Sequence, residues 1–199
     1  MTERRLYLAS RSPRRAEGLR LLGVDFRLVD VEVDEDPRAG EAPADYVRRV
    51  AEAKARAGTG QLPDGALVLA ADTTVCIDGE ILGKPRDAAE GEAMLSRLSG
   101  RWHEVYTAVV VGTREARAIE LVRTRVEFVT LDAATIAAYW ASGEPADKAG
   151  AYGIQGLGGA LVRRIDGSYG AVVGLPLAET VALLEQAGVG CALRRAMAD

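Results

Sequence analysis

Apolar and polar positions along the chain follow two different periods. Short apolar or alternating runs are typical of strands, whereas longer stretches with apolar residues three or four apart indicate helices. The expected strands cover residues 6–9, 26–33, 66–71, 75–77, 80–82, 105–112, 118–129, 160–165 and 170–173, and the expected helices cover 12–22, 44–57, 88–98, 133–141 and 176–187. This interleaving predicts an α/β fold with a mixed, twisted sheet and helices on its faces.

Local signals define several boundaries between these elements. Ser12 followed by Pro13 predicts the start of the first helix, with serine as N-cap and proline at the first helical position. Asp78-Gly79 separates two short strand-like runs and is a strong hairpin signal. Asp166-Gly167 predicts a second hairpin, which would join the runs at 160–165 and 170–173.

Length and composition narrow the class of protein. The 199 residues contain no repeat and no linker, so we expect one domain over 1–199, divided into two lobes around a cleft. A net charge of −4 argues against binding nucleic acid, and no apolar run approaches the length of a membrane span. Cys76 and Cys191 lack the spacing of a metal or redox pair, which indicates reduced thiols and a cytoplasmic protein.

Two arginines occupy an unusual place at the start of the first helix. Arg14 and Arg15 lie in its first turn, where the helix dipole disfavours cations. They are better explained if an anion binds there, held by free backbone amides and the two guanidinium groups. The alternative is that both side chains simply point into solvent.

Acidic side chains suggest a place for a metal or a water. Asp72 directly follows the apolar run 66–71, and ligands of α/β sheets gather at strand ends. An acid there can hold a divalent cation or orient a water, although a turn or a helix cap would explain it equally well. Asp34 and Glu35 are candidates for a second metal-binding element, or belong to a solvated loop.

The segment 147–159 is the richest in chemistry. It contains five glycines together with Lys148, Tyr152 and Gln155, which are good ligand contacts. We expect it to approach a ligand through its main chain, as a lid, unless it is a surface loop without a role. Lys54 and Lys84 add further cations for a polyanion, although each lysine taken alone could be merely solvated.

Several familiar motifs fail on inspection. The run from Gly79 to Pro85 has three residues between its glycines instead of four, and proline replaces the Ser or Thr of a phosphate loop. The only histidine, His103, excludes a histidine-rich metal site, and a structural role for it is favoured over a catalytic one.

Taken together, the motifs resemble those of the Maf family of nucleotide pyrophosphatases. The matching stretches occur in family order: LASRSPRR at 8–15, ADTTV at 71–75, GKP at 83–85, LSG at 98–100, DKAGAYGIQG at 147–156 and VGLP at 173–176. The resemblance implies a two-lobed fold similar to that of inosine triphosphate pyrophosphatases. It also implies hydrolysis of a nucleoside triphosphate to the monophosphate and pyrophosphate with Mg²⁺ or Mn²⁺, and a homodimer.

The same resemblance assigns roles to individual residues. Asp72 matches the catalytic acid of the family, which is proposed to act as base on the attacking water, and it matches a metal ligand together with Glu35, for which Asp34 is the alternative. The substrate-binding positions are Ser10, Arg15, Lys54 and Lys84, to which the glycine-rich segment adds Lys148.

Three further positions bear on the choice of base. Arg14, Thr73 and Gln155 are similar to the branch of the family that acts on dTTP and UTP; the branch acting on 7-methyl-GTP has Trp, Gln and Glu there. A glutamine amide offers both a donor and an acceptor to the edge of uracil or thymine. We therefore expect the dTTP/UTP branch.

Two other functions stay open. A nucleotide-sensing regulator of cell division or septum formation would bind the nucleotide without appreciable turnover. A metal-dependent phosphomonoesterase would release orthophosphate instead of pyrophosphate.

Overall fold

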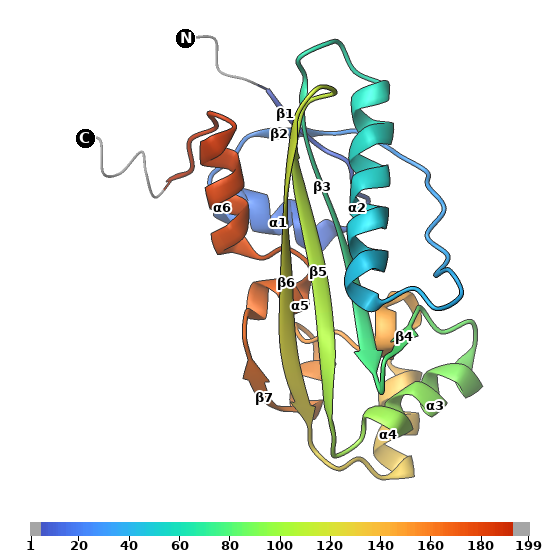
Figure 1. Cartoon of the computed structure of the whole chain (residues 1–199). Helices are drawn as coiled ribbons and strands as arrows, with labels where there is room; N and C mark the ends of the chain where they lie inside the picture. Colours follow the sequence, from blue (N-terminus) through green and yellow to red (C-terminus); the bar gives the residue numbers. More distant parts are fainter. Residues whose placement is uncertain (1–4, 193–199) are drawn as a thin grey trace.

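The structure, a computed structural model, describes residues 5–192 and is built on one long mixed sheet (Figure 1). Within that range the strand order is β2-β1-β3-β5-β6-β7, and β4 pairs with the far end of β3. The strands are β1 (Leu6–Leu8), β2 (Phe26–Leu28), β3 (Leu67–Ile77), β4 (Glu80–Leu82), β5 (Trp102–Gly112), β6 (Arg117–Phe128) and β7 (Val162–Asp166). β1 runs parallel to β2 and β3, and the other pairs are antiparallel, so the α/β class is confirmed.

Helices cover both faces of this sheet. They are α1 (Pro13–Leu21), α2 (Pro43–Gly60), α3 (Ala88–Leu98), α4 (Ala133–Ala141), α5 (Tyr169–Val173) and α6 (Leu177–Gln186), with 3₁₀ turns η1 (Glu144–Asp147), η2 (Ala149–Ala151) and η3 (Leu157–Leu161). No helix of the described chain has the length and apolar character needed to cross a bilayer.

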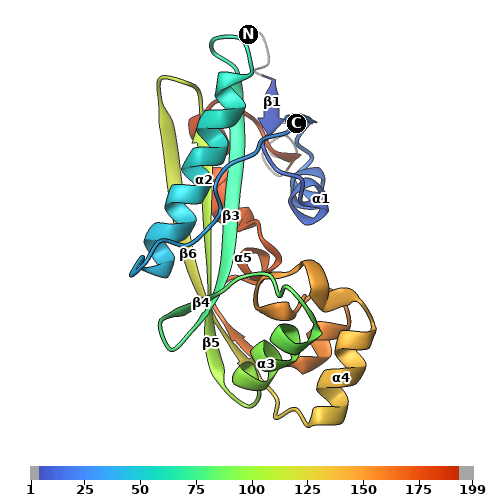
Figure 2. The ribbon, with the colours of Figure 1, turned by 90° about the vertical axis from the view of Figure 1, so that its right-hand side faces the viewer.

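The pleat of β3 divides the core of the first lobe, which contains α1, α2 and α6, into two layers. Leu67, Leu69 and Ala71 pack with α1 and α6 on one face, whereas Val68 and Ala70 pack with α2 on the other. This alternation follows from the two-residue period of a strand, and Figure 2 shows α1 and α2 on opposite sides of β3. Side chains that follow on β3 therefore also alternate between the α1 side and the α2 side.

A second lobe forms around the other end of the long strands (Figure 2). There α3, α4 and the 3₁₀ turns pack on β3, β5 and β6, around a core that includes Leu95, Leu98 and Phe128. The β3–β4 hairpin belongs to this lobe, and its turn residues Asp78 and Gly79 have φ angles of 56° and 79°. Both lie in the left-handed region that a two-residue hairpin needs, so the predicted turn is confirmed.

Three differences from the expected elements stand out in the structure. The runs at 66–71 and 75–77 are one strand, so Asp72 lies in the middle of β3 and does not follow its end. The ladder with β5 runs without a break from Val68↔Gly112 to Cys76↔Glu104. The polar residues 72–74 are paired within it and therefore belong to the strand.

The other two differences concern shorter segments. Residues 170–173 form helix α5 instead of a strand, because the Ser168 hydroxyl accepts the backbone N–H of Ala171 and caps a helical turn. The strand expected over 26–33 ends at Leu28, since β1 offers only three residues for pairing.

One edge of β3 is open in the middle of the sheet. β1 pairs with β3 only as far as Leu69, and β4 pairs only from Val75 onwards. Between these points no other described strand pairs with that edge, and the unpaired stretch carries Asp72 and Thr73. The gap between two strand partners thus leaves room for a site at the junction of the lobes.

Candidate active site

A cleft of about 1250 Å³ opens at this gap. It is lined by α1, α2, β3 and the segment 144–156, so both lobes contribute. Apart from Asp34, its walls contain the candidate site residues selected from the sequence: Ser10, Arg14, Arg15, Glu35, Lys54, Asp72, Thr73, Lys84, Lys148 and Gln155. Residues spread over most of the chain are therefore brought to one place, which is the arrangement expected of a binding site.

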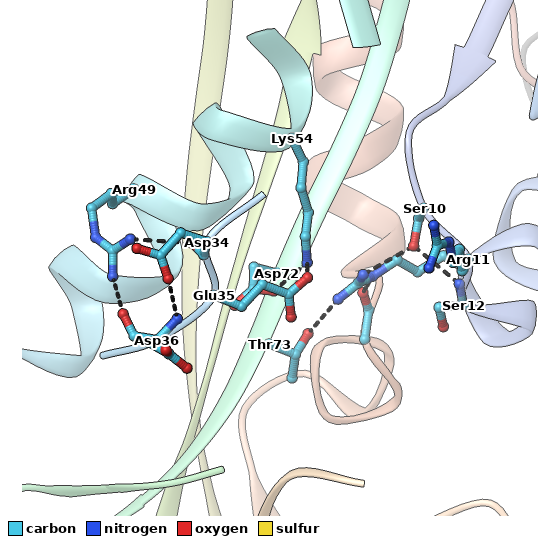
Figure 3. A network of polar contacts seen from close by, with 12 residues as sticks. Ser10, Arg11, Ser12, Asp34, Glu35, Asp36, Arg49, Lys54, Asp72 and Thr73 are labelled. Carbon is cyan, nitrogen blue, oxygen red and sulfur yellow. Dashed lines mark hydrogen bonds and ion pairs between the residues drawn. The ribbon is translucent and has the colours of Figure 1, made fainter. Parts of the chain in front are cut away.

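The acidic part of the cleft is centred on Lys54 of α2 (Figure 3). Its ammonium nitrogen lies 2.8 Å from Oδ1 of Asp72 and 2.8 Å from Oε1 of Glu35. Asp72 is 5% exposed, and its second oxygen, Oδ2, is buried without a hydrogen-bond partner in the described chain. A carboxylate oxygen left in this way is costly unless something outside the chain uses it.

The two carboxylates differ in their affinity for protons. Burial raises the pKa of Asp72, and the nearby charges of Lys54 and Arg15 only partly offset this. Burial also tends to raise the pKa of Glu35. The hydrogen bond from Lys54 and the positive charges of Lys54, Lys84 and Arg15 outweigh this effect, so the pKa of Glu35 is lowered. The pKa values of the two carboxylates are thus shifted in opposite directions.

The loop that carries Glu35 is fastened to α2. The Tyr46 hydroxyl donates to the carbonyl of Glu35 at 2.8 Å, and Arg49 donates to the carbonyl of Asp36 at 2.9 Å and to the Glu41 carboxylate. The side chain of Asp34 accepts the N–H of Asp36 and lies outside the cleft lining. Of the two candidate acids, Glu35 is therefore the one in the cleft. No sequence motif pointed to Tyr46 and Arg49, which bind the loop that carries it.

The carboxylates of Asp72 and Glu35 suit a hard divalent cation that takes its remaining ligands from water and substrate. No group of three or more His, Cys, Asp or Glu side chains converges within residues 5–192. Asp72 and Glu35 are the two carboxylates that meet at Lys54 in the cleft. Mg²⁺ is commonly held by one or two carboxylates, with water and substrate phosphates completing its shell. The two carboxylates already converge on one cation, the Lys54 ammonium, and Oδ2 of Asp72 is unpaired, so these residues fit such an ion.

On the other face of β3, Arg15 is buried at 8% exposure and does not point into solvent. Its guanidinium donates to the carbonyl of Gly174 at 3.0 Å, to Oγ of Ser10 at 3.1 Å and to Oγ1 of Thr73 at 3.3 Å. Burial lowers its pKa, and the charge of Asp72 partly offsets the effect. Arg14 is half-buried and also faces the cleft.

A hydrogen-bond network that reaches β5 and α5 supports Thr73. Its hydroxyl lies 2.9 Å from that of Thr107 on β5, and Thr107 donates to the carbonyl of Ala171 in α5 at 2.8 Å. Thr107 is fully buried, and the sequence analysis missed it. A polar residue inside the apolar run 105–112 was the signal that could have found it.

The glycine-rich segment is folded into 3₁₀ turns and is not a loose lid. Lys148 and Gln155 line the cleft, and the ammonium of Lys148 donates to the carbonyl of Glu144 and to Asp147, both at 2.7 Å. Tyr152, expected as a ligand contact, also borders the cleft, but it is 5% exposed and its hydroxyl is 2.8 Å from Nε2 of His103.

His103 belongs to the core of the second lobe. Its ring stacks edge-on against Phe128 and Tyr152, and burial lowers its pKa to about 3, so it stays neutral. It lies outside the cleft lining, as a structural histidine should.

Comparison with known proteins agrees with the pattern of residues in the cleft. The model of the Maf-like protein family matches residues 5–187. The chain belongs to the Maf family.

Its relatives in this family match over nearly their full length. A protein of Methylobacillus flagellatus is 54% identical over 93% of this chain and 94% of its own; one of Myxococcus xanthus is 55% identical over 92% and 93%. Both are named dTTP/UTP pyrophosphatase. Among solved structures, the Ham1 protein of Staphylococcus aureus is similar over 63% of this chain and 72% of its own, with 15% identity and a TM-score of 0.47.

Proposed function

We propose that this Maf family member hydrolyses dTTP and UTP to the monophosphate and pyrophosphate. The names of relatives more than 50% identical over nine-tenths of the chain support the reaction and the substrates. The observation that carries the chemistry is Asp72, a buried acid with one unpaired oxygen and a raised pKa, surrounded by cations in a cleft.

The cations of the cleft suit a triphosphate. Ser10 and Arg15 present a hydroxyl and a guanidinium from the α1 side, whereas Lys54 and Lys84 approach from the α2 and β4 sides. Lys148 adds a charge from the second lobe. These groups bind the phosphate oxygens and, as pyrophosphate leaves, stabilise the charge that develops on it.

Asp72 supplies the base. Its unpaired Oδ2 accepts a hydrogen bond from the attacking water, orients it toward the α-phosphorus and takes its proton. The positive charges of Lys54 and Arg15 favour the ionised carboxylate that this step requires. We expect no covalent intermediate.

We propose that a divalent cation, Mg²⁺ or Mn²⁺, binds at Asp72 and Glu35. When bound it would neutralise phosphate charge and lower the pKa of a water ligand. Lys54 would then move from between the two carboxylates toward the phosphates, which the four-carbon side chain allows.

Base choice is assigned to Arg14, Thr73 and Gln155. Gln155 is exposed at the mouth of the cleft, where its amide can meet the polar edge of a pyrimidine. We also propose that the 199 residues act as one two-lobed domain and form a homodimer in the cytoplasm, as the family resemblance implies. Sedimentation equilibrium would test the dimer.

A product assay tests the proposed reaction. Purified protein with Mg²⁺ or Mn²⁺ is given dTTP, UTP, CTP, GTP, ITP or 7-methyl-GTP, and pyrophosphate and orthophosphate are measured separately. Pyrophosphate chiefly from dTTP and UTP is the expected result. A purine preference would refute the base assignment, release of orthophosphate would indicate a phosphomonoesterase, and tight binding without turnover would point to a sensor.

A further inference from the structure

The carboxylate of Glu144 organises the part of the cleft that carries Gln155. Its Oε1 accepts the Tyr139 hydroxyl at 2.8 Å and the N–H of Gly158 at 3.0 Å, and its Oε2 accepts the N–H of Leu157 at 2.8 Å. Three hydrogen bonds on a half-buried carboxylate are more than a side chain at the rim of a cleft ordinarily makes.

Tyr139 anchors the main chain on the N-terminal side of Gln155. Its hydroxyl, which donates to Glu144, accepts the N–H of Gly153 at 3.1 Å. The main chain is thus fixed at Gly153 and again at Leu157, two residues on either side of Gln155. The residues between them, 154–156, form an arch at the cleft, and no side chain of the described residues hydrogen-bonds the Gln155 amide.

The glycines of the arch explain how the carboxylate reaches the main chain. A Cβ on Gly156 would lie 2.1 Å from Oε2 of Glu144, and one on Gly158 would lie 2.4 Å from the Tyr139 hydroxyl. Any other residue at either position would push the anchors away. The close approach that the glycine content predicted is therefore an approach to Glu144 and Tyr139, and the N–H groups of Gly153, Leu157 and Gly158 are bonded within the chain.

A fixed arch matters because the amide of glutamine has two usable orientations. One presents the donor and acceptor that suit uracil, and the same group turned over suits cytosine. Anchoring the backbone does not itself stop the amide from turning over, but it fixes the place and angle at which the amide meets both the base and the other groups of the cleft, so that one orientation can be preferred there. We propose that Glu144, acting with Tyr139, is a positioning residue for Gln155 and thereby sets the preference for uracil and thymine over cytosine. This inference rests on the proposed function.

The test compares Glu144→Gln with the wild type, using UTP and CTP as substrates. The amide keeps the shape but replaces one acceptor oxygen by a donor facing an N–H, so at least one anchor is lost. We expect the kcat/KM preference for UTP over CTP to fall about tenfold, chiefly through a higher KM for UTP. Glu120→Gln, at an exposed position on β6 outside the cleft, is the matched control and should keep the preference.

A double-mutant cycle separates positioning from general damage. In a Gln155→Ala background, Glu144→Gln should change the UTP/CTP preference no further, because the group that it positions is absent. An equal loss of preference in both backgrounds would overturn the proposal. So would retention of the wild-type preference, within about twofold, by Glu144→Gln.

Hydrogen exchange gives an independent measurement. The amides of Gly153, Leu157 and Gly158 should exchange faster in Glu144→Gln than in wild type and in Glu120→Gln, and unchanged exchange would also overturn the proposal. Tyr139→Phe, which removes only a hydroxyl, serves the same purpose if Glu144→Gln does not fold. Should the wild type release no pyrophosphate from UTP, the proposed function fails and the base-reading role with it, whereas exchange still reports whether Glu144 holds the arch.

Discussion

Asp72 and Thr73 are neighbours in β3, yet they lie in opposite chemical environments. Asp72 faces α2, where one of its oxygens bonds to Lys54 and the other is buried without a partner. Thr73 faces α1, and its hydroxyl is bonded to Arg15 and also to Thr107, which bonds further to the carbonyl of Ala171. One face of the strand is incompletely satisfied, and the other forms a continuous network.

The difference shows how the site divides its tasks. A fully bonded network is rigid and suits the recognition of a fixed group, such as a phosphate held by Arg15. An acid with a free oxygen and a raised pKa is poorly stabilised in the folded chain but suits proton transfer. We therefore expect substitutions on the α2 face to affect mainly turnover, and those on the α1 face to affect mainly binding and stability.

The largest effect is expected for Asp72→Asn. The amide cannot take a proton from water, so kcat should fall about 10³-fold while the fold is kept. Steady-state pyrophosphate release and circular dichroism would measure the two quantities. Asp166→Asn, at an exposed position of β7, is the control; a loss in Asp72→Asn of less than about tenfold would remove Asp72 from its role.

Arg15→Lys should have the next largest effect, and it should act on binding. Lysine cannot reproduce the three guanidinium contacts to Gly174, Ser10 and Thr73, so the KM for dTTP should rise about 10- to 100-fold with a smaller change in kcat. Arg48→Lys, at an exposed position on α2, makes the same exchange without these contacts. A loss confined to kcat would contradict the division between the two faces.

Thr107→Val tests the network behind Thr73. Valine keeps the shape but leaves the Ala171 carbonyl without its donor, so the free energy of unfolding in urea should fall by about 1–3 kcal/mol. Thr180 offers a sharp control because it too is fully buried, but its hydroxyl has no partner in the described chain. Thr180→Val should be neutral or stabilising, and equal losses in both variants would mean that the network contributes nothing.

The smallest effect concerns the stability of Asp72→Asn. Because the pKa of Asp72 is raised in the folded state, the folded chain binds a proton more tightly than the unfolded chain. The contribution of Asp72 to stability is therefore present below its unfolded pKa of about 3.9 and is lost as pH rises through the folded pKa. Without metal, with EDTA present, Asp72→Asn should therefore melt above the wild type at pH 7.5.

The same measurement at lower pH provides the check. The gain in Tm should shrink at pH 4, where more of the wild-type Asp72 is protonated and resembles the amide. A gain in Tm that is constant with pH, or a lower Tm at pH 7.5, would show that the ionised carboxylate of Asp72 does not destabilise the folded state.

Local pattern was sufficient for much of the fold. The predicted limits of α3 and α4 agree with the structure, and Asp78-Gly79 forms the expected turn. In these segments the period of apolar residues, the caps and the turn residues all indicate the same structure. The α/β class followed from their order along the chain.

Predictions failed where distant partners decide the structure. Polar residues at 72–74 looked like the end of a strand, but pairing with β5 keeps them inside β3. The candidate site residues do share one cleft, although their individual roles stay predictions. Glu144 and Thr107 were missed, because their backbone partners Leu157, Gly158 and Ala171 lie between 13 and 64 residues away along the chain.

The unbroken pairing of β3 with β5 has a consequence for how this chain can vary in length. Nine consecutive pairs with β5 fix the register of β3, from Val68 to Cys76. A deletion or insertion of one residue just before Asp72 would turn every following side chain to the opposite face of the sheet. The acid would then point toward Arg15 and a hydroxyl toward Lys54, so both halves of the site would be lost at once, although the composition of the cleft would hardly change. Substitutions can accumulate in this strand one at a time, but changes of length can be tolerated only in the turns at its ends.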